Sequence, residues 1–334
     1  MNIFDSRGLK DTAASRLSEA AYNPRLLVLI HTGISLGSAL LVAVLSYILE
    51  QKIAATGGLS GIGLRSVLTT AQSFLQLVLM LLTPFWGIGI VYAAIGLARG
   101  QTAAPKDLTA GFQRFGPVLR LKLLQLFLYG ALAMPCMYVS AGIFSITPLS
   151  RDFQELIFPI WEQAMVTGQI AQLDAATMDA ILQTMLPLIP IFILLYLAAF
   201  LPLMYRLRMA EYVIMDDAPC GAMQALIASW KMTRGRASAL LKLDLSFWWF
   251  YGLQVLAIGL AYCDQLLPLL GISLPIPADG AYFLFYGLYI VAELALFWRF
   301  GGYLHTTYAV AYEALRHQLP VPQQNPFPDQ PEQM

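Results

Sequence analysis

Charged residues are scarce in this chain of 334 residues: Asp, Glu, Lys and Arg make up 12% of it, whereas hydrophobic residues make up 58%. Soluble globular domains carry about 25% charged residues, so this composition excludes an ordinary soluble fold. The apolar residues occur in blocks, and several blocks exceed the ~20 residues that a helix needs to cross a bilayer. Because a spanning helix satisfies its own backbone hydrogen bonds, the sequence predicts an all-α, polytopic membrane helical bundle.

Motifs for catalysis and cofactor binding are also lacking. The three cysteines, Cys136, Cys220 and Cys263, are far apart and give no metal-ligand spacing. The chain has no GxxxxGK[ST] phosphate loop and no HExxH. We therefore expect no cofactor and no enzymatic activity, and an enzyme acting on a lipid-soluble substrate is an alternative with no residue set behind it. The net charge of zero gives no reason to expect a nucleic-acid partner.

Six apolar segments are long enough to be membrane spans. They lie at about 25–49, 64–98, 121–146, 186–205, 243–266 and 281–304. The second is too long for one straight crossing, and Pro84 within it predicts a kink. We divide the chain into an N-terminal amphipathic segment (1–24), a six-span membrane domain (25–316) and a Pro/Gln-rich tail (317–334) that we expect to be disordered.

The distribution of basic residues predicts the orientation of the spans. Fifteen Lys and Arg residues flank one side, in the N-terminal stretch through Arg25 and in the connections within 99–122 and 206–242. The connections on the other side hold three, Lys52, Arg65 and Arg151. Since basic residues stay on the cytoplasmic side of a membrane, we expect both termini to be cytoplasmic in a bacterial inner membrane.

Each basic segment also contains apolar residues at helical spacing. These are Leu9, Ala13 and Leu17 in the first segment, Leu108, Phe112, Phe115 and Leu119 in the second, and Met223, Leu226, Ile227 and Trp230 in the third. Such stripes indicate amphipathic helices that lie on a membrane surface or against the bundle. We therefore expect three helical hairpins, each preceded by a cytoplasmic amphipathic helix, with breaks at Pro24, Gly116-Pro117 and Gly235.

The third basic segment and the end of the last span carry a recognisable pattern. It consists of Ser229, Met232, Gly235, Leu243, Leu245, Ser246, Phe247 and Trp249, followed much later by Tyr308, Tyr312 and Ala314-Leu315-Arg316. This pattern resembles a bacterial integral membrane family catalogued as domain of unknown function 975. The resemblance covers the C-terminal third closely and the rest by topology, and the long 147–185 connection departs from it. It implies a multi-span bacterial membrane protein and brings no activity, substrate or catalytic residue.

Ionisable side chains within the spans are candidates for function, because a charge at membrane depth is costly unless it is paired or hydrated. Glu293, near the middle of the sixth span, is the strongest candidate. Asp244 and Arg299 should lie at similar depth, and we expect them to form an ion pair that either fixes packing or contacts a ligand. His31 is expected to be a buried neutral histidine with a backbone or hydroxyl partner, and a proton relay is the alternative.

Gln72 and Gln76 lie on one polar face of the second span, together with Arg65, Thr69 and Thr83. Interhelical hydrogen bonding is the main interpretation of this face, and a polar pore lining is the alternative.

Basic residues on the cytoplasmic side are candidate contacts for lipid headgroups. They are Lys231, Arg234, Arg236, Lys242, Arg114, Arg120 and Lys122. Because such clusters attract anionic lipids, we expect a non-enzymatic membrane-organising or accessory protein whose basic face contacts anionic lipid or a membrane-protein partner. The alternative is a small-solute or ion transporter or channel, with Glu293 and the polar face of the second span along the path.

Overall fold

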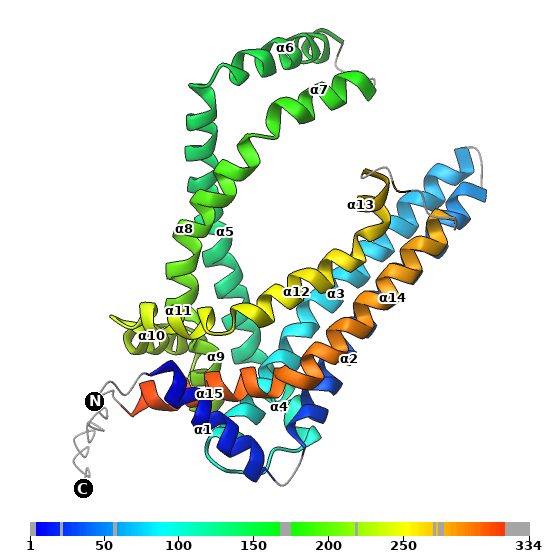
Figure 1. Ribbon diagram of the computed structural model, residues 1–334. Helices are drawn as coiled ribbons and strands as arrows, with labels where there is room; N and C mark the ends of the chain where they lie inside the picture. The colour runs from blue at the N-terminus through cyan, green and yellow to red at the C-terminus, as the bar shows by residue number, and fades with distance from the viewer. Residues whose placement is uncertain are drawn as a thin grey trace, which may run out of the picture. The chain divides into compact units, whose positions relative to one another are not determined.

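The computed structural model in Figure 1 describes residues 5–20, 23–55, 59–167, 175–217, 220–269, 272 and 277–317. Within these ranges the regular structure is helical and no strand is found, in agreement with the predicted all-α class. The chain divides into two compact units, one made of residues 1–121 and 209–334 and the other of residues 122–208. We describe each unit by itself.

Five helices in the described residues are long and apolar enough to cross a membrane: Pro24–Ile48, Thr69–Ala98, Phe115–Ser145, Asp179–Asp216 and Gly280–Arg316. A sixth is added if α11 (Ala237–Leu245) and α12 (Trp248–Ala261), which meet at 61°, form one broken span. Each of these overlaps one of the six predicted segments, so the apolar helices fit a multi-pass membrane protein.

The larger unit is built around long helices that lie side by side. In Figure 1, α2 (Pro24–Ala55) runs beside α3 (Leu59–Ala98), and α12 runs beside α14 (Ala278–Leu296). The short helix α13 (Cys263–Leu269) follows α12 and also packs on α14. After α14 the chain passes through a π-helix, η2 (Phe297–Gly301), into α15 (Gly302–Arg316), which packs on α3.

The N-terminal helix α1 (Ser6–Glu19) was predicted to lie on the membrane surface or against the bundle, and the structure places it against α15. Its Leu9 and Ala13 are buried, as the helical spacing of these residues suggested. The Lys10 ammonium donates a hydrogen bond to the carbonyl oxygen of Ser246 at 2.8 Å and lies 4.1 Å from the centre of the Phe247 ring. These contacts attach α1 to the bend between α11 and α12.

The second basic segment does not form the continuous amphipathic helix that we expected. It forms a 3₁₀-helix, η1 (Pro105–Thr109), then a single turn, α4 (Ala110–Gln113), before α5 (Phe115–Ser145) begins. Both short elements pack on α3, and Leu108 is buried in the core with Leu27 and Ile90. The apolar stripe of this segment therefore contacts protein, which explains its spacing without a lipid surface.

The third basic segment forms α10 (Ala222–Thr233), which packs on α9 (Ala210–Asp216). Leu226 is buried, whereas Met223, Ile227 and Trp230 lie on an exposed face. The predicted stripe therefore divides into an inner and an outer side. Gly235 follows α10 with a φ of 76°, a conformation that a side chain disfavours, and turns the chain into α11.

The smaller unit contains most of α5, then α6 (Leu149–Thr167), α7 (Ala175–Met185) and α8 (Leu188–Leu207). The rings of Tyr129 and Phe200 meet at 4.9 Å and join α5 to α8, and α6 packs on α7. The long acidic connection is thus largely helical within the described residues. The predicted disordered tail, from residue 318 onward, lies outside them.

Two glycines permit the contact between α3 and the η1–α4 segment. A Cβ at Gly89 would collide with the backbone of Leu108, and a Cβ at Gly111 would collide with the carbonyl of Phe85. Because backbone atoms cannot rotate away, we expect Gly89→Ala and Gly111→Ala each to lower the free energy of unfolding by about 1–3 kcal/mol. Thermal unfolding of the purified protein in detergent measures this.

Gly87→Ala is the matched control on the same helix. A Cβ at Gly87 would lie 3.8 Å from the His31 Nε2, an ordinary contact, so this variant should be neutral or more stable by up to ~1 kcal/mol. Equal stability of the Gly87 and Gly89 variants would contradict the close approach.

Candidate functional site

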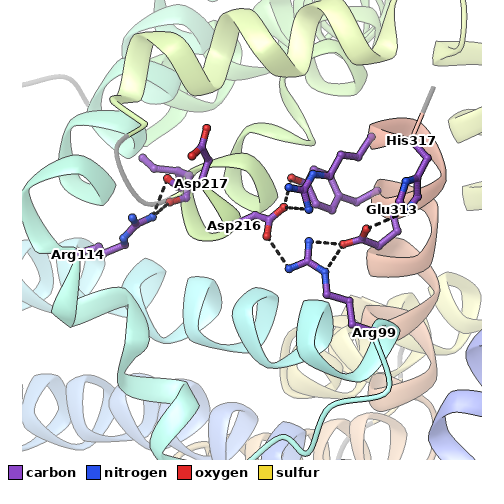
Figure 2. A network of polar contacts seen from close by, with 9 residues as sticks. Arg99, Arg114, Asp216, Asp217, Glu313 and His317 are labelled. Carbon is purple, nitrogen blue, oxygen red and sulfur yellow. Dashed lines mark hydrogen bonds and ion pairs between the residues drawn. The ribbon is translucent and has the colours of Figure 1, made fainter. Parts of the chain in front are cut away.

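A network of ion pairs joins the ends of α3, α9 and α15 around Asp216 (Figure 2). The Asp216 side chain is only 6% exposed and lies between two guanidinium groups. Arg99 Nη1 is 2.7 Å from its Oδ1, and Arg316 Nη1 is 2.8 Å from its Oδ2. The hydroxyl of Tyr312 donates a further hydrogen bond to Oδ2 at 2.9 Å.

Arg99 connects this carboxylate to a second one. Its Nη2 lies 2.6 Å from Glu313 Oε1, and its Nε donates to the same oxygen at 2.7 Å. The hydrogen bond to Asp216 raises the pKa of Arg99 above its usual value, so this guanidinium stays charged at every physiological pH. His317 lies on the outer side of Glu313, with Nε2 at 3.7 Å from Oε2.

Local structure places each member of the network. α3 ends at Ala98, and Gly100, with a φ of 74°, reverses the chain so that the amide of Gln101 donates to the carbonyl of Gly96 at 2.8 Å. This is the geometry of a helix C-cap that requires glycine, and it fixes Arg99 at the helix end. On α15, the Tyr312 ring stacks on Tyr212 of α9 at 5.3 Å.

A further arginine fixes the end of α9. Arg114 Nη1 donates to the carbonyl oxygens of Ile214 and Asp217, the latter at 3.2 Å (Figure 2). Arg114 had been selected as a headgroup contact, but its half-buried guanidinium binds backbone carbonyls of the protein. It therefore serves the packing of this unit.

The charges of the Asp216 network balance, with two carboxylates facing two guanidinium groups. Each of these four groups has a partner at hydrogen-bonding distance. Across the described ranges, no cluster of three or more His, Cys, Asp or Glu side chains could hold a metal ion. The arrangement is therefore a clamp between helices.

Asp244 and Arg299, which we expected to pair, have other neighbours. The Tyr308 hydroxyl donates to Asp244 Oδ1, and the Tyr251 hydroxyl lies 3.0 Å from that of Tyr308. This polar chain links α11, α15 and α12. The Arg299 guanidinium lies 5.1 Å from the centre of the Phe300 ring.

The other intramembrane candidates are spread over separate places. Glu293 is buried in α14, with 4% of its surface exposed. His31 lies beside Gly87, and its Nε2 has no hydrogen-bond partner among the described atoms, unlike the paired histidine that we expected. Gln72 donates to Ser46 Oγ on α2, an interhelical bond of the expected kind, while Gln76 is exposed. The structure does not gather these residues into one site.

The remaining candidate headgroup contacts differ in exposure. Arg120, Lys231, Arg234 and Lys242 are exposed, whereas Arg236 is half-buried. Lys122 is half-buried and belongs to the smaller unit.

Sequence reasoning missed the Asp216 network. Tyr312 and Arg316 were part of the recognised pattern, but nothing in the pattern pointed to Asp216 or Arg99 as their partners. The available signal was the acidic pair Asp216-Asp217 at the end of an apolar segment, within a connection that carries six basic residues. A carboxylate placed among arginines is a candidate for pairing.

Several residues of the recognised pattern lie in the buried centre of the larger unit. Ser229, Leu243, Phe247, Tyr308 and Tyr312 are all less than 5% exposed. Ser229 Oγ accepts a hydrogen bond at 3.1 Å from the amide of Met209, just before α9. These residues of the pattern therefore contribute to the packing of α9, α10, α11 and α15.

The chain belongs to the family described as "Protein of unknown function (DUF975)", whose model matches residues 1–318. The match extends over the long connection that had seemed to depart from the family. No curated protein and no solved structure matches the sequence significantly.

Asp216→Asn tests the clamp. Loss of the charge leaves the Arg99 and Arg316 guanidinium groups without their shared partner, so we expect the free energy of unfolding to fall by about 2–4 kcal/mol. The expected loss is smaller than for a fully buried ion pair, because both arginines are partly exposed and can be rehydrated. Thermal unfolding in detergent gives the measurement.

Asp217→Asn makes the same change one residue away on an exposed side chain, and it should alter stability by less than ~0.5 kcal/mol. If the two variants were equally stable, the network would not hold the helix ends together.

Proposed function

We propose that this protein is a non-enzymatic, membrane-organising or accessory protein whose basic face contacts anionic lipids. In this proposal six spans cross a bacterial inner membrane as three hairpins, and both termini are cytoplasmic. The single observation that carries the lipid contact is the outer side of α10, where exposed apolar and basic residues lie together.

The proposed topology draws support from the Asp216 network. Alternating spans bring the ends of the second, fourth and sixth to the same side of a membrane. Arg99 follows the second predicted span, Asp216 follows the fourth and Arg316 follows the sixth, and these three side chains meet. The contact of Lys10 with Ser246, before the start of α12, also supports an N-terminal helix at the same end.

The outer side of α10 has the composition of a helix that lies in a membrane interface. Met223, Ile227 and Trp230 are 58%, 48% and 47% exposed and follow one helical face. Lys231 and Arg234 are exposed at the end of this helix. Apolar side chains that enter the acyl region, with basic ones at headgroup level, describe an interfacial helix.

At this face, basic side chains outnumber the acidic side chains that form ion pairs with them. The two arginines of the clamp are neutralised by Asp216 and Glu313. The exposed Lys231, Arg234 and Lys242 add positive charge beyond that balance, and each contributes roughly 1 kcal/mol near an anionic membrane surface.

Removal of these three charges tests the lipid contact. In nanodiscs that contain equal amounts of phosphatidylglycerol and phosphatidylcholine, we expect the wild-type protein to retain phosphatidylglycerol preferentially when it is extracted. Lys231→Gln, Arg234→Gln and Lys242→Gln together should reduce this preference several-fold, and raised salt should weaken it in the wild type. Mass spectrometry of the retained lipids provides the readout.

Arg151→Gln serves as a control, since Arg151 is exposed on α6 and belongs to the side with few basic residues. An unchanged preference in the triple variant would contradict the proposal.

A transporter or channel is the second candidate, and the burial of Glu293 is the observation that favours it. A carboxyl group 4% exposed within the candidate span Gly280–Arg316 is a typical position for a proton or ion relay. The Asp216 clamp, by contrast, is fully paired and offers no path.

Glu293→Gln separates the two candidates. For an accessory protein we expect wild-type and variant proteoliposomes to show the same background flux of protons and small cations. The variant should fold with stability within ~1 kcal/mol of the wild type, because the amide keeps the volume of the carboxyl group. A pH-driven flux in the wild type that a folded variant loses would establish the transporter.

A further inference from the structure

A pocket of about 750 Å³ lies between α1, the start of α2, the start of α12 and the η2–α15 junction. All four parts belong to the larger unit. Its volume falls within the range of sites that hold small molecules or lipid headgroups, about 300–1,000 Å³. Neither the clamp at Asp216 nor the outer side of α10 contributes to it.

A glycine lets two walls of this pocket pack closely. A Cβ at Gly301 would lie 2.5 Å from Val28 Cγ1, whereas one at Gly302 would lie 3.7 Å from Pro24 Cβ, an ordinary contact. The start of α2 therefore approaches the backbone of η2 closely. As a result Arg25, the second residue of α2, reaches the same pocket as Arg299.

The π-helix η2 places Arg299 and Phe300 at this junction. A π-helix carries one more residue per turn than an α-helix, which rotates the side chains that follow, and such segments are frequent at functional sites. Phe300 meets Trp249 of α12 edge to face, with ring centres 4.6 Å apart. Together these rings form an aromatic wall beside the two arginines.

The polar lining is made of groups that can donate hydrogen bonds. Arg25, Arg299, Ser18, Trp249 and Tyr303 all carry donors, and no Asp or Glu lies among the lining residues. Across the described part of the chain, neither arginine lies within ion-pair distance of a carboxylate. Two such guanidinium groups match a phosphate, which accepts paired hydrogen bonds from arginine.

We propose that this pocket binds the phosphate headgroup of an anionic phospholipid. This inference rests on the lipid contact proposed above and assigns one part of it to a defined site. Arg25 and Arg299 hold the phosphate oxygens, and the hydroxyls of Ser18 and Tyr303 donate to the rest of the headgroup. Trp249 and Phe300 accommodate the start of the acyl chains.

The position of the pocket favours a lipid over a soluble phosphate compound. It lies where the candidate span at Pro24 begins and where α12 begins, after the bend of the broken pair α11–α12. Headgroups and aromatic side chains meet at the ends of membrane spans. The half-buried Trp249 gives it an apolar side that a soluble phosphate would not use.

Native mass spectrometry of the full-length protein in detergent tests this site. With added short-chain phosphatidylglycerol, we expect one lipid to bind the wild type tightly. The double variant Arg25→Gln, Arg299→Gln should weaken that binding about 10- to 30-fold. Ala14→Trp, which fills the pocket from the exposed side of α1 without a change of charge, should also prevent it.

Three comparisons decide the outcome. The triple variant Lys231→Gln, Arg234→Gln, Lys242→Gln should keep the tightly bound lipid, so that loss of the surface contact and loss of the pocket are seen separately. Phosphatidylcholine should bind weakly, and inorganic phosphate or glycerol phosphate at millimolar concentration should not displace the lipid. Wild-type affinity in both folded pocket variants would overturn the site, and stabilisation by soluble phosphate alone would overturn the lipid as its ligand.

Discussion

The helix ends of the larger unit are held together by one carboxylate with little access to water. Asp216 accepts hydrogen bonds from two arginines and a tyrosine, and each of these residues lies about a hundred residues from Asp216 along the chain. A charge that is 6% exposed persists only when it is paired, so Arg99 and Arg316 must both reach it. This requirement fixes the ends of α3, α9 and α15, and the Tyr212–Tyr312 stack and the Arg114 contacts build on it.

Close backbone approach is the second constraint. Gly89 and Gly111 allow the η1–α4 segment to lie directly on α3, and Gly301 allows α2 to lie directly on η2. In an apolar solvent, helices gain little from burying apolar surface against each other, so small residues that permit close packing carry more of the association. The two contacts have different consequences. The first closes the core around Leu108, and the second leaves a pocket beside Arg25 and Arg299.

Charge is used in two ways in this protein. Inside the clamp, positive and negative groups balance and hold the structure. On the outer side of α10 and in the pocket, the basic groups form no ion pair within the described residues and are suited to an anionic ligand. This division supports an accessory role at the membrane surface more directly than a transport path, since the polar groups within the spans are dispersed.

The sequence by itself determined the all-helical class, the position of the apolar segments and the membership of the family, because segment length, composition and short patterns are local properties. It also indicated α1 and α10 from their periodicity. It could not show that the stripe with Leu108 faces protein, since the same 3–4 residue spacing serves a lipid surface and a core. Nor could it pair Asp216 with Arg99 or direct Asp244 to Tyr308, because these contacts depend on which helices meet. Only the tertiary structure decided them, through close approaches at glycine and through the cost of burying a charge without a partner.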